Sequence, residues 1–112
     1  MESSLAIKRL SALAQPSRLA VFRLLVKAGP EGVAAGEIAR LLSITSNTLS
    51  AQLNVLTNAG LISNRRDGRS IIYAANYDGM GELLVYLMED CCQGRPEVCA
   101  PLGAAASRAA CC

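Results

Sequence analysis

The sequence contains no histidine and no tryptophan, few aromatic residues, and no cysteine before residue 91. Without histidine, neither the usual histidine-containing zinc sites nor an ordinary nucleophile–base pair can form. No glycine-rich phosphate-binding loop is present, and no apolar run approaches the roughly 20 residues that cross a bilayer. The N-terminus, MESSLAIKRL, also lacks the layout of a signal peptide. These absences argue against an enzyme and against a membrane protein, and favour a cytoplasmic protein.

What is present is a short chain rich in alanine and leucine. Its 112 residues suffice for one domain with a modest core, and its composition favours helices. Residues 1–76 carry nine basic and four acidic side chains, whereas residues 77–112 carry two basic and five acidic ones. A basic body fits an anionic partner, and the acidic C-terminal part fits a separate task.

Apolar residues recur at helical spacing in five segments of the chain. The pattern predicts helices over residues 3–14, 16–28, 35–42, 46–59 and 78–90. In the third segment, Ile38, Leu41 and Leu42 are expected to face inward. The fourth segment has a single inward stripe, which consists of Leu49, Leu53 and Leu56.

Between the fourth and fifth helices the apolar period changes to that of β-strands. Residues 61–66 and 69–74 are expected to form two strands around an Asp67-Gly68 turn, because Asp-Gly between such runs is a strong hairpin signal. Arg65, Arg66 and Arg69 lie close to this turn. Three guanidinium groups on a protruding ribbon are well placed to contact DNA phosphates or the minor groove.

Two short helices followed by a basic hairpin describe a winged helix-turn-helix, so we expect a mainly α fold with a β-hairpin wing. The leucine stripe holds the fourth helix to the body and leaves its outer face free to enter the major groove. That face carries small or amide side chains that suit base edges: Asn47, Thr48, Ser50, Ala51, Gln52 and Asn54. With the three wing arginines, these residues form the predicted interface with double-stranded DNA.

Three segments of the chain carry a further signal. They are Leu10–Leu25 (LSALAQPSRLAVFRLL), Thr48–Ile62 (TLSAQLNVLTNAGLI) and Asp67–Tyr73 (DGRSIIY). Together they resemble the ArsR/SmtB family of bacterial metal- and metalloid-responsive repressors, over about residues 5–92. The resemblance implies a homodimer, formed by the first and last helices, that binds an inverted-repeat operator and is released by an inducer.

The chain departs from this family in two places. Many members carry a cysteine motif on the first helix of the helix-turn-helix, but Gly36–Leu42 (GEIARLL) contains no cysteine. Others bind zinc on the last helix through histidines and acids, and this chain has no histidine. What remains resembles the branch of arsenic repressors with a thiol site after the last helix.

All five cysteines lie within the last 22 residues, which argues against a role in stapling the fold. In a reducing compartment, such thiols are ligands or sensors more often than disulfides. Trivalent arsenic or antimony takes three soft sulfur ligands on one side of the ion, and the Gly-x-Pro spacer at residues 94–96 lets the chain fold back to supply them. The predicted ligands are Cys91, Cys92 and Cys99, with Cys111 and Cys112 as accessory thiols.

The sequence therefore predicts a DNA-binding and dimerisation domain over residues 1–92 and a flexible cysteine-containing tail over residues 93–112. The expected function is a repressor that leaves its operator when As(III), with Sb(III) as a second candidate inducer, binds the three cysteines. No prosthetic group is expected. Two alternatives stay open. Neighbouring cysteines also suit a thiol redox-sensing repressor, and a thiol-rich metalloid carrier that binds no DNA is the third interpretation.

Overall fold

The computed structural model describes residues 1–91, 97 and 100–101 of the chain. Helices and a three-stranded sheet follow one another in residues 1–91 in this order: α1 (Ser3–Leu13), α2 (Pro16–Ala28), β1 (Val33–Ala34), α3 (Ala35–Leu42), α4 (Ser46–Asn58), β2 (Ile62–Asp67), β3 (Ser70–Ala75) and α5 (Tyr77–Cys91). This order confirms the predicted mainly α fold with a β-hairpin wing. In the described part of the chain, no helix is both long enough and apolar enough to cross a membrane.

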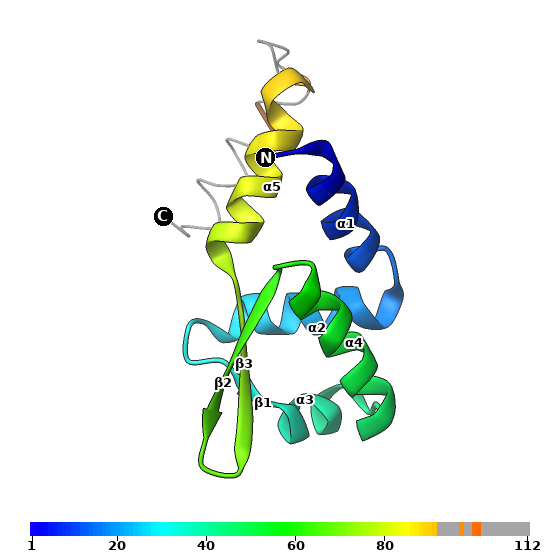
Figure 1. The fold of residues 1–112 in the computed structure, drawn as a ribbon, viewed down its shortest axis with the longest axis vertical. Coiled ribbons are helices and arrows are strands. Elements are labelled where there is room, and N and C mark those ends of the chain that lie inside the picture. Colours follow the sequence, from blue (N-terminus) through cyan, green and yellow to red (C-terminus); the bar gives the residue numbers. More distant parts are fainter. Residues whose placement is uncertain (92–96, 98–99, 102–112) are drawn as a thin grey trace.

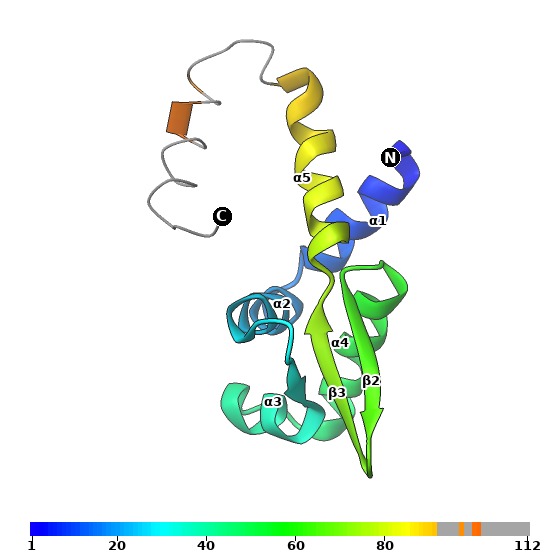
Figure 2. The ribbon, with the colours of Figure 1, turned by 90° about the vertical axis from the view of Figure 1, so that its left-hand side faces the viewer.

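The elements divide the molecule into two ends. Helices α1 and α5 stand together at one end, whereas α3 and the tip of the β2–β3 hairpin lie at the other (Figure 1). Helices α2 and α4 lie between these ends in both views (Figures 1 and 2). The predicted dimerisation helices are therefore separated from the predicted DNA-reading end.

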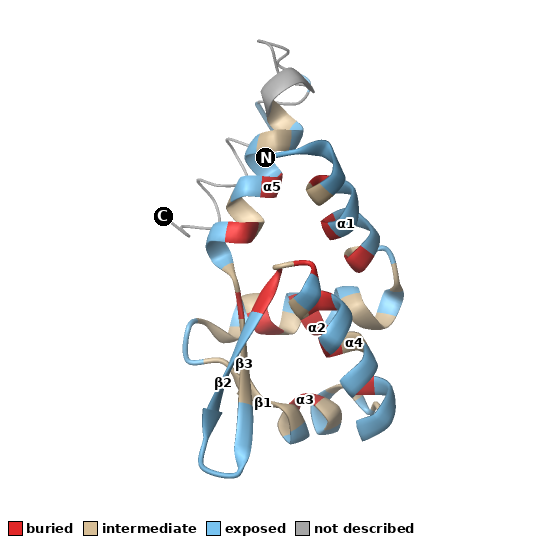
Figure 3. Ribbon diagram, in the orientation of Figure 1, coloured by how far each residue is buried: buried red, intermediate tan, exposed pale blue. Residues whose placement is uncertain are grey.

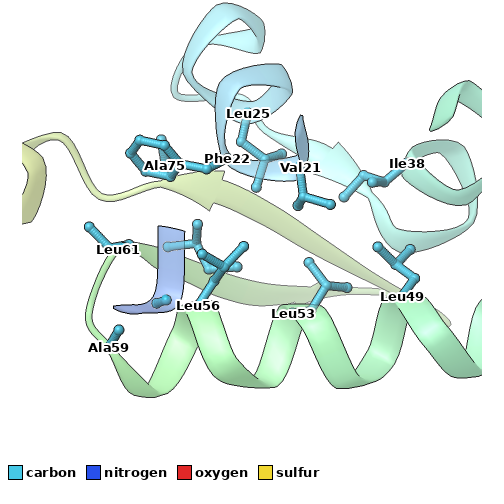
Figure 4. Close-up of a cluster of buried hydrophobic side chains, with 12 residues drawn as sticks. Val21, Phe22, Leu25, Ile38, Leu49, Leu53, Leu56, Ala59, Leu61 and Ala75 are labelled. Atoms are coloured by element: carbon cyan, nitrogen blue, oxygen red, sulfur yellow. The ribbon is translucent and has the colours of Figure 1, made fainter. Parts of the chain in front are cut away.

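The hydrophobic core lies between α2, α3, α4 and the sheet. The three leucines of the α4 stripe point into this core, where Leu49 lies opposite Ile38 of α3 and the other two face the apolar side chains of α2, as Figure 4 shows. All three are almost completely buried, which confirms the predicted inward face of α4. The prediction for Leu41 is wrong, because this side chain is 50% exposed. Ile38 is fully buried and Leu42 packs against the core, as predicted. Ile44, just beyond the end of α3, also packs against the core.

The sheet contains one strand more than the sequence pattern predicts. Strand β1 pairs antiparallel with β3 through Val33↔Tyr73 and Ala34↔Ile72, which gives the strand order β1-β3-β2. With two residues, β1 is too short to show an alternating pattern. The hairpin turn is also displaced by one residue. Because Asp67 pairs with Ser70, the two loop residues are Gly68 and Arg69, with a φ of +63° at Gly68.

Helices α1 and α5 leave many large apolar side chains uncovered in the single chain. On α1 the buried residues are Ala6, Arg9 and Ala12, whereas Ile7 is 63% exposed. Figure 3 shows that most of the surface of both helices is exposed or only partly buried. Tyr77, at the start of α5, is also exposed, and its hydroxyl donates to the Val26 carbonyl. The other uncovered large apolar residues of the two helices are Ile7, Leu10, Leu84, Val85 and Leu87, and we refer to these five as the α1/α5 apolar face.

Candidate nucleic-acid interface

The turn between α3 and α4 is held by backbone conformation and by a helix cap. Ser43 adopts a left-handed conformation (φ 54°, ψ 44°), and the Ile44 N–H donates to the Ala39 carbonyl at 3.0 Å. This bond, which spans one residue more than a helical bond, belongs to the Schellman arrangement that ends many helices. Thr45 then caps α4, with its Oγ1 accepting from the Thr48 N–H at 3.4 Å. The two helices are thereby joined by only three residues.

The outer face of α4 presents most of the predicted base-reading residues to solvent. Asn47, Thr48, Ser50, Ala51 and Asn54 are all exposed. Thr45 Oγ1 also donates to Thr48 Oγ1 at 2.9 Å, so the cap holds the Thr48 hydroxyl oxygen in place. The first two turns of α4 thus offer amide, hydroxyl and methyl groups, which are the groups that read base edges in the major groove.

Gln52 differs from the other predicted base-reading residues. It is half-buried, and its Oε1 accepts a hydrogen bond from Arg18 Nη1 at 3.1 Å. Arg18 also donates through Nε to the Ala12 carbonyl at 2.6 Å. The amide oxygen of Gln52 therefore fastens α4 to the α1–α2 corner, and its NH₂ group is the part left for a base.

Arg18 is a contributor to this interface that sequence reasoning missed. It lies on α2, outside the helix-turn-helix and the wing, and its partner Gln52 is 34 residues away. No local pattern marks such a pair. A signal was present only in the segment Leu10–Leu25, which contains Arg18 and carries part of the resemblance.

The three wing arginines point in different directions. Arg65 Nη2 donates to the Glu31 carbonyl at 2.7 Å, which ties the wing to the loop between α2 and β1. Arg66 is next along the strand and therefore faces the opposite side of the hairpin. Arg69 lies in the two-residue loop at the tip. All three are exposed, so positive charge covers both sides and the tip of the wing.

Helix α3 carries an exposed ion pair beside this interface. Arg40 donates to both carboxylate oxygens of Glu37, at 2.9 Å from Nε to Oε2 and more closely from Nη2 to Oε1. These hydrogen bonds hold the pKa of the Glu37 carboxyl below its usual value. Any stabilisation from the lowered pKa is fully present above the usual carboxyl pKa and is lost as the pH falls through the lowered value. Because both groups are solvent-exposed, the effect on stability is small.

Comparison with known proteins agrees with this geometry. A family model described as a helix-turn-helix domain matches residues 13–65. The nodulation protein NolR of Rhizobium meliloti is 34% identical over 83 residues, which cover 74% of this chain and 66% of that protein. A putative arsenical resistance operon repressor ArsR of Halobacterium salinarum is 40% identical over 60 residues, which cover 54% of this chain and 46% of the repressor. The chain thus spans two thirds or less of the length of these relatives.

Solved structures extend the likeness to the whole winged helix-turn-helix. NolR from Sinorhizobium fredii is 34% identical with a TM-score of 0.63, and the match covers 78% of this chain and 84% of that one. A homodimeric winged helix-turn-helix DNA-binding domain from Mycobacterium bovis, described as a possible ArsR-family transcriptional regulator, is 28% identical with a TM-score of 0.64. That match covers 78% of this chain and 80% of the domain. The chain belongs to the ArsR/SmtB family.

Membership of the ArsR/SmtB family confirms the resemblance seen in three sequence segments. The relatives are DNA-binding transcriptional regulators rather than enzymes, and the helix-turn-helix model covers both α3 and α4. The chain is therefore a winged helix-turn-helix transcriptional regulator of this family. The individual DNA contacts assigned to α4 and the wing stay predictions.

The cysteine site predicted for this ArsR/SmtB regulator lies mostly outside the described residues. Cys91 is the last residue of α5, whereas Cys92, Cys99, Cys111 and Cys112 fall in the part of the chain that the structure does not describe. Within residues 1–91, 97 and 100–101, no three histidine, cysteine, aspartate or glutamate side chains are grouped to hold a metal ion. The three-thiol site therefore stays a prediction, as does the division into residues 1–92 and 93–112.

Proposed function

We propose that this ArsR/SmtB regulator represses transcription by binding an inverted-repeat operator as a homodimer. We further propose that As(III), bound by Cys91, Cys92 and Cys99, releases it from that operator. Sb(III), which shares the preference for three thiolates, is the second candidate inducer. No prosthetic group takes part.

The observation that carries the DNA-binding part is the exposed first half of α4 beside an arginine-bearing wing. A helix of this kind fits the major groove, and the exposed guanidinium groups of Arg66 and Arg69 suit the phosphates that flank that groove. Residues 1–76, which contain the helix-turn-helix and the wing, carry an excess of positive charge. In this arrangement α4 supplies the base contacts, which read the sequence, and the wing supplies phosphate contacts, which fix the register on the duplex.

The α1/α5 apolar face supports the homodimer. Ile7 and Val85 are 63% and 58% exposed in the single chain, and uncovered apolar side chains of this size mark protein interfaces when they are contiguous. The related domain from Mycobacterium bovis is homodimeric. A two-fold axis at this end of the molecule directs both α4 helices to the opposite end, towards one face of the duplex.

The chemistry of the donor set supports the inducer. Three thiols without any imidazole suit a soft trivalent metalloid, and the first of them, Cys91, ends the helix that contributes to the α1/α5 apolar face. Arsenous acid is neutral. When three thiols replace its three hydroxyls, three As–S bonds form, each hydroxyl leaves as water with the proton of one thiol, and the net charge is unchanged. Release from DNA therefore requires a change in the shape of the dimer rather than charge repulsion.

The test is operator binding by the reduced full-length protein, with an operator first selected from randomised duplexes. Binding is followed by fluorescence anisotropy while arsenite, cadmium or peroxide is added in separate titrations. We expect arsenite to lower the affinity by about 5–150-fold, the range of typical allosteric coupling. A small competing dithiol is expected to remove As(III) and restore binding, which separates induction from denaturation.

The chain itself supplies matched controls for this test. The variants Cys91→Ser, Cys92→Ser and Cys99→Ser are each expected to bind the operator normally and to ignore arsenite. The double variant Cys111→Ser/Cys112→Ser removes two thiols from the same region and is expected to respond like the wild type. The three-thiol proposal is wrong if a Cys99→Ser dimer still leaves its operator at the wild-type arsenite concentration. Release by peroxide alone identifies the redox-sensing alternative.

A further inference from the structure

Among residues 1–88, Arg9 is the one charged residue that is buried. It is 7% exposed and lies on α1, on the face that turns towards the body between Ala6 and Ala12. A buried guanidinium is unfavourable unless its donors are bonded, whereas an apolar side chain of the same size carries no such requirement. A buried arginine at this position is therefore favourable only because its guanidinium group makes specific hydrogen bonds.

Those bonds join three helices. Arg9 Nε donates to the Ala59 carbonyl at 2.9 Å, directly after the end of α4. Its Nη1 donates to the Gly79 carbonyl at 2.8 Å, in the first turn of α5, and lies 3.5 Å from Glu82 Oε1. A cation at the C-terminal end of α4 also complements the partial negative charge of the last carbonyl groups. The Arg9 side chain of α1 thus binds both the C-terminal end of α4 and the beginning of α5.

The surrounding contacts leave this joint little freedom. Asn76 Nδ2 donates to the Gly60 carbonyl at 2.8 Å, and the Gly79 N–H donates to Asn76 Oδ1 at 3.2 Å. A Cβ at Gly79 would lie 2.5 Å from the Gly60 carbonyl oxygen, so the backbones meet without room for a side chain. We refer to Arg9, Ala59, Gly60, Asn76 and Gly79 as the Arg9 junction.

We propose that Arg9 is a positioning residue for operator recognition: it sets the angle of α4 relative to the dimerisation helices, and thereby the half-site separation that the homodimer prefers. This inference rests on the proposed function, because it presupposes a homodimer on an inverted repeat. The Arg9 junction lies at one end of α4, and the predicted base-reading residues begin at the other end.

Because α4 is long, a small change in its angle to the dimerisation helices produces a large displacement of its N-terminal end. Its 13 residues span about 20 Å. A tilt of about 10° at the C-terminal end moves the N-terminal end by about 3.4 Å, which equals the rise of one base pair. Both subunits tilt together about the two-fold axis, so a small change at the two junctions alters the register of the dimer on its operator.

The experiment compares three operator duplexes whose half-sites are separated by the selected distance, by one base pair less and by one base pair more. The wild type, Arg9→Met, Arg9→Lys and two control variants are assayed as reduced full-length proteins. Lys8→Met removes the neighbouring exposed cation of α1, and Glu82→Gln removes only the exposed carboxylate next to Arg9. Dimer dissociation and thermal unfolding are measured for every variant.

For the wild type and both controls, we expect the selected spacing to be favoured over the altered ones by at least about tenfold, as for a mismatched base pair. In Arg9→Met we expect this preference to fall to within about threefold, with Arg9→Lys in between, because a single ammonium group cannot hold both carbonyls in the same geometry. Dimer dissociation and non-specific DNA binding are expected to change little.

A merely structural role for Arg9 predicts a different result. In that case Arg9→Met has a lower thermal stability, but the ratio of its affinities for the different half-site spacings is unchanged. That outcome in a folded, dimeric Arg9→Met overturns the inference. If Arg9→Met does not fold, an unchanged ratio in Arg9→Lys overturns it equally. If the wild type itself shows no selected operator, the proposed function fails and the inference falls with it, which is a distinct outcome.

Discussion

At the scale of single residues, Ser43 carries a local cost at the corner of the helix-turn-helix. It is the one non-glycine residue with a positive φ in the described part of the chain. Glycine adopts this conformation without steric conflict, so we expect Ser43→Gly to stabilise the protein by about 0.5–1 kcal/mol. Thermal unfolding is expected to shift upward by several degrees. The matched control is Ser50→Gly inside α4, where glycine is expected to lower the melting temperature by a similar amount.

Asn47 and Gln52 test which α4 residues read bases and which hold the helix. Asn47 is exposed near the start of α4, so Asn47→Ala is expected to cost about 1–3 kcal/mol on the selected operator and to relax specificity at one position. Gln52→Ala removes the acceptor of Arg18 and is expected to lower thermal stability by about 1 kcal/mol. Binding to operators with single base changes measures the effect of Asn47→Ala, and thermal unfolding measures that of Gln52→Ala. Equal loss on all duplexes for Asn47→Ala contradicts its role as a base reader.

At the scale of elements, the arginines of the wing have two different roles: Arg66 and Arg69 are expected to contact phosphates, whereas Arg65 holds the wing to the body. Arg66→Ala and Arg69→Ala are each expected to reduce the slope of log affinity against log salt by about 1, because each removes one phosphate contact. Arg65→Ala is expected to lower thermal stability as well, since Arg65 is bonded to the Glu31 carbonyl. Arg23→Ala, an exposed arginine on α2, serves as the control with an unchanged slope. Slopes that match the wild type in Arg66→Ala and Arg69→Ala exclude phosphate contact by the wing.

Elements with a long apolar period could be predicted from the sequence, and elements defined by pairing could not. The α4 stripe repeats over eight residues, so its helix and buried face follow from the sequence. Strand β1 exists only because Val33 and Ala34 pair with β3, some 40 residues away. The sequence pattern places the hairpin turn one residue too early for the same reason, because the Asp67↔Ser70 pairing, and not the Asp-Gly dipeptide, defines the loop.

In the functional site, too, residues on one periodic element could be predicted from the sequence, whereas residues that act through distant elements could not. The exposed face of α4 and the wing arginines follow from composition at fixed spacing along one element. Arg9 and Arg18 do not, because each acts through carbonyl or amide oxygens of distant elements. An arginine on an amphipathic helix is normally solvated, and only the tertiary structure shows that Arg9 is buried. The thiol cluster is the reverse case: its composition suggests the chemistry, and its geometry lies outside the described residues.

At the scale of the whole molecule, function depends on the α1/α5 apolar face being covered by a second copy. A charge placed in the middle of that face disfavours association without affecting the core, because both chosen positions are exposed in the single chain. Ile7→Glu and Val85→Glu are therefore expected to give folded monomers in sedimentation experiments. Leu19→Glu, which places the same charge at a 43% exposed position on α2, is expected to stay dimeric.

The monomeric variants also separate dimer formation from DNA reading. Each monomer keeps α4 and the wing, so it still has the groups that contact one half-site, but it loses the simultaneous engagement of two. We expect operator affinity to fall by at least about a hundredfold, to the level of non-specific binding, while Leu19→Glu retains operator binding. Anisotropy titrations at fixed salt measure both. If Ile7→Glu and Val85→Glu remain dimeric and bind the operator normally, the two copies meet through another surface, and the dimerisation role of α1 and α5 must be abandoned.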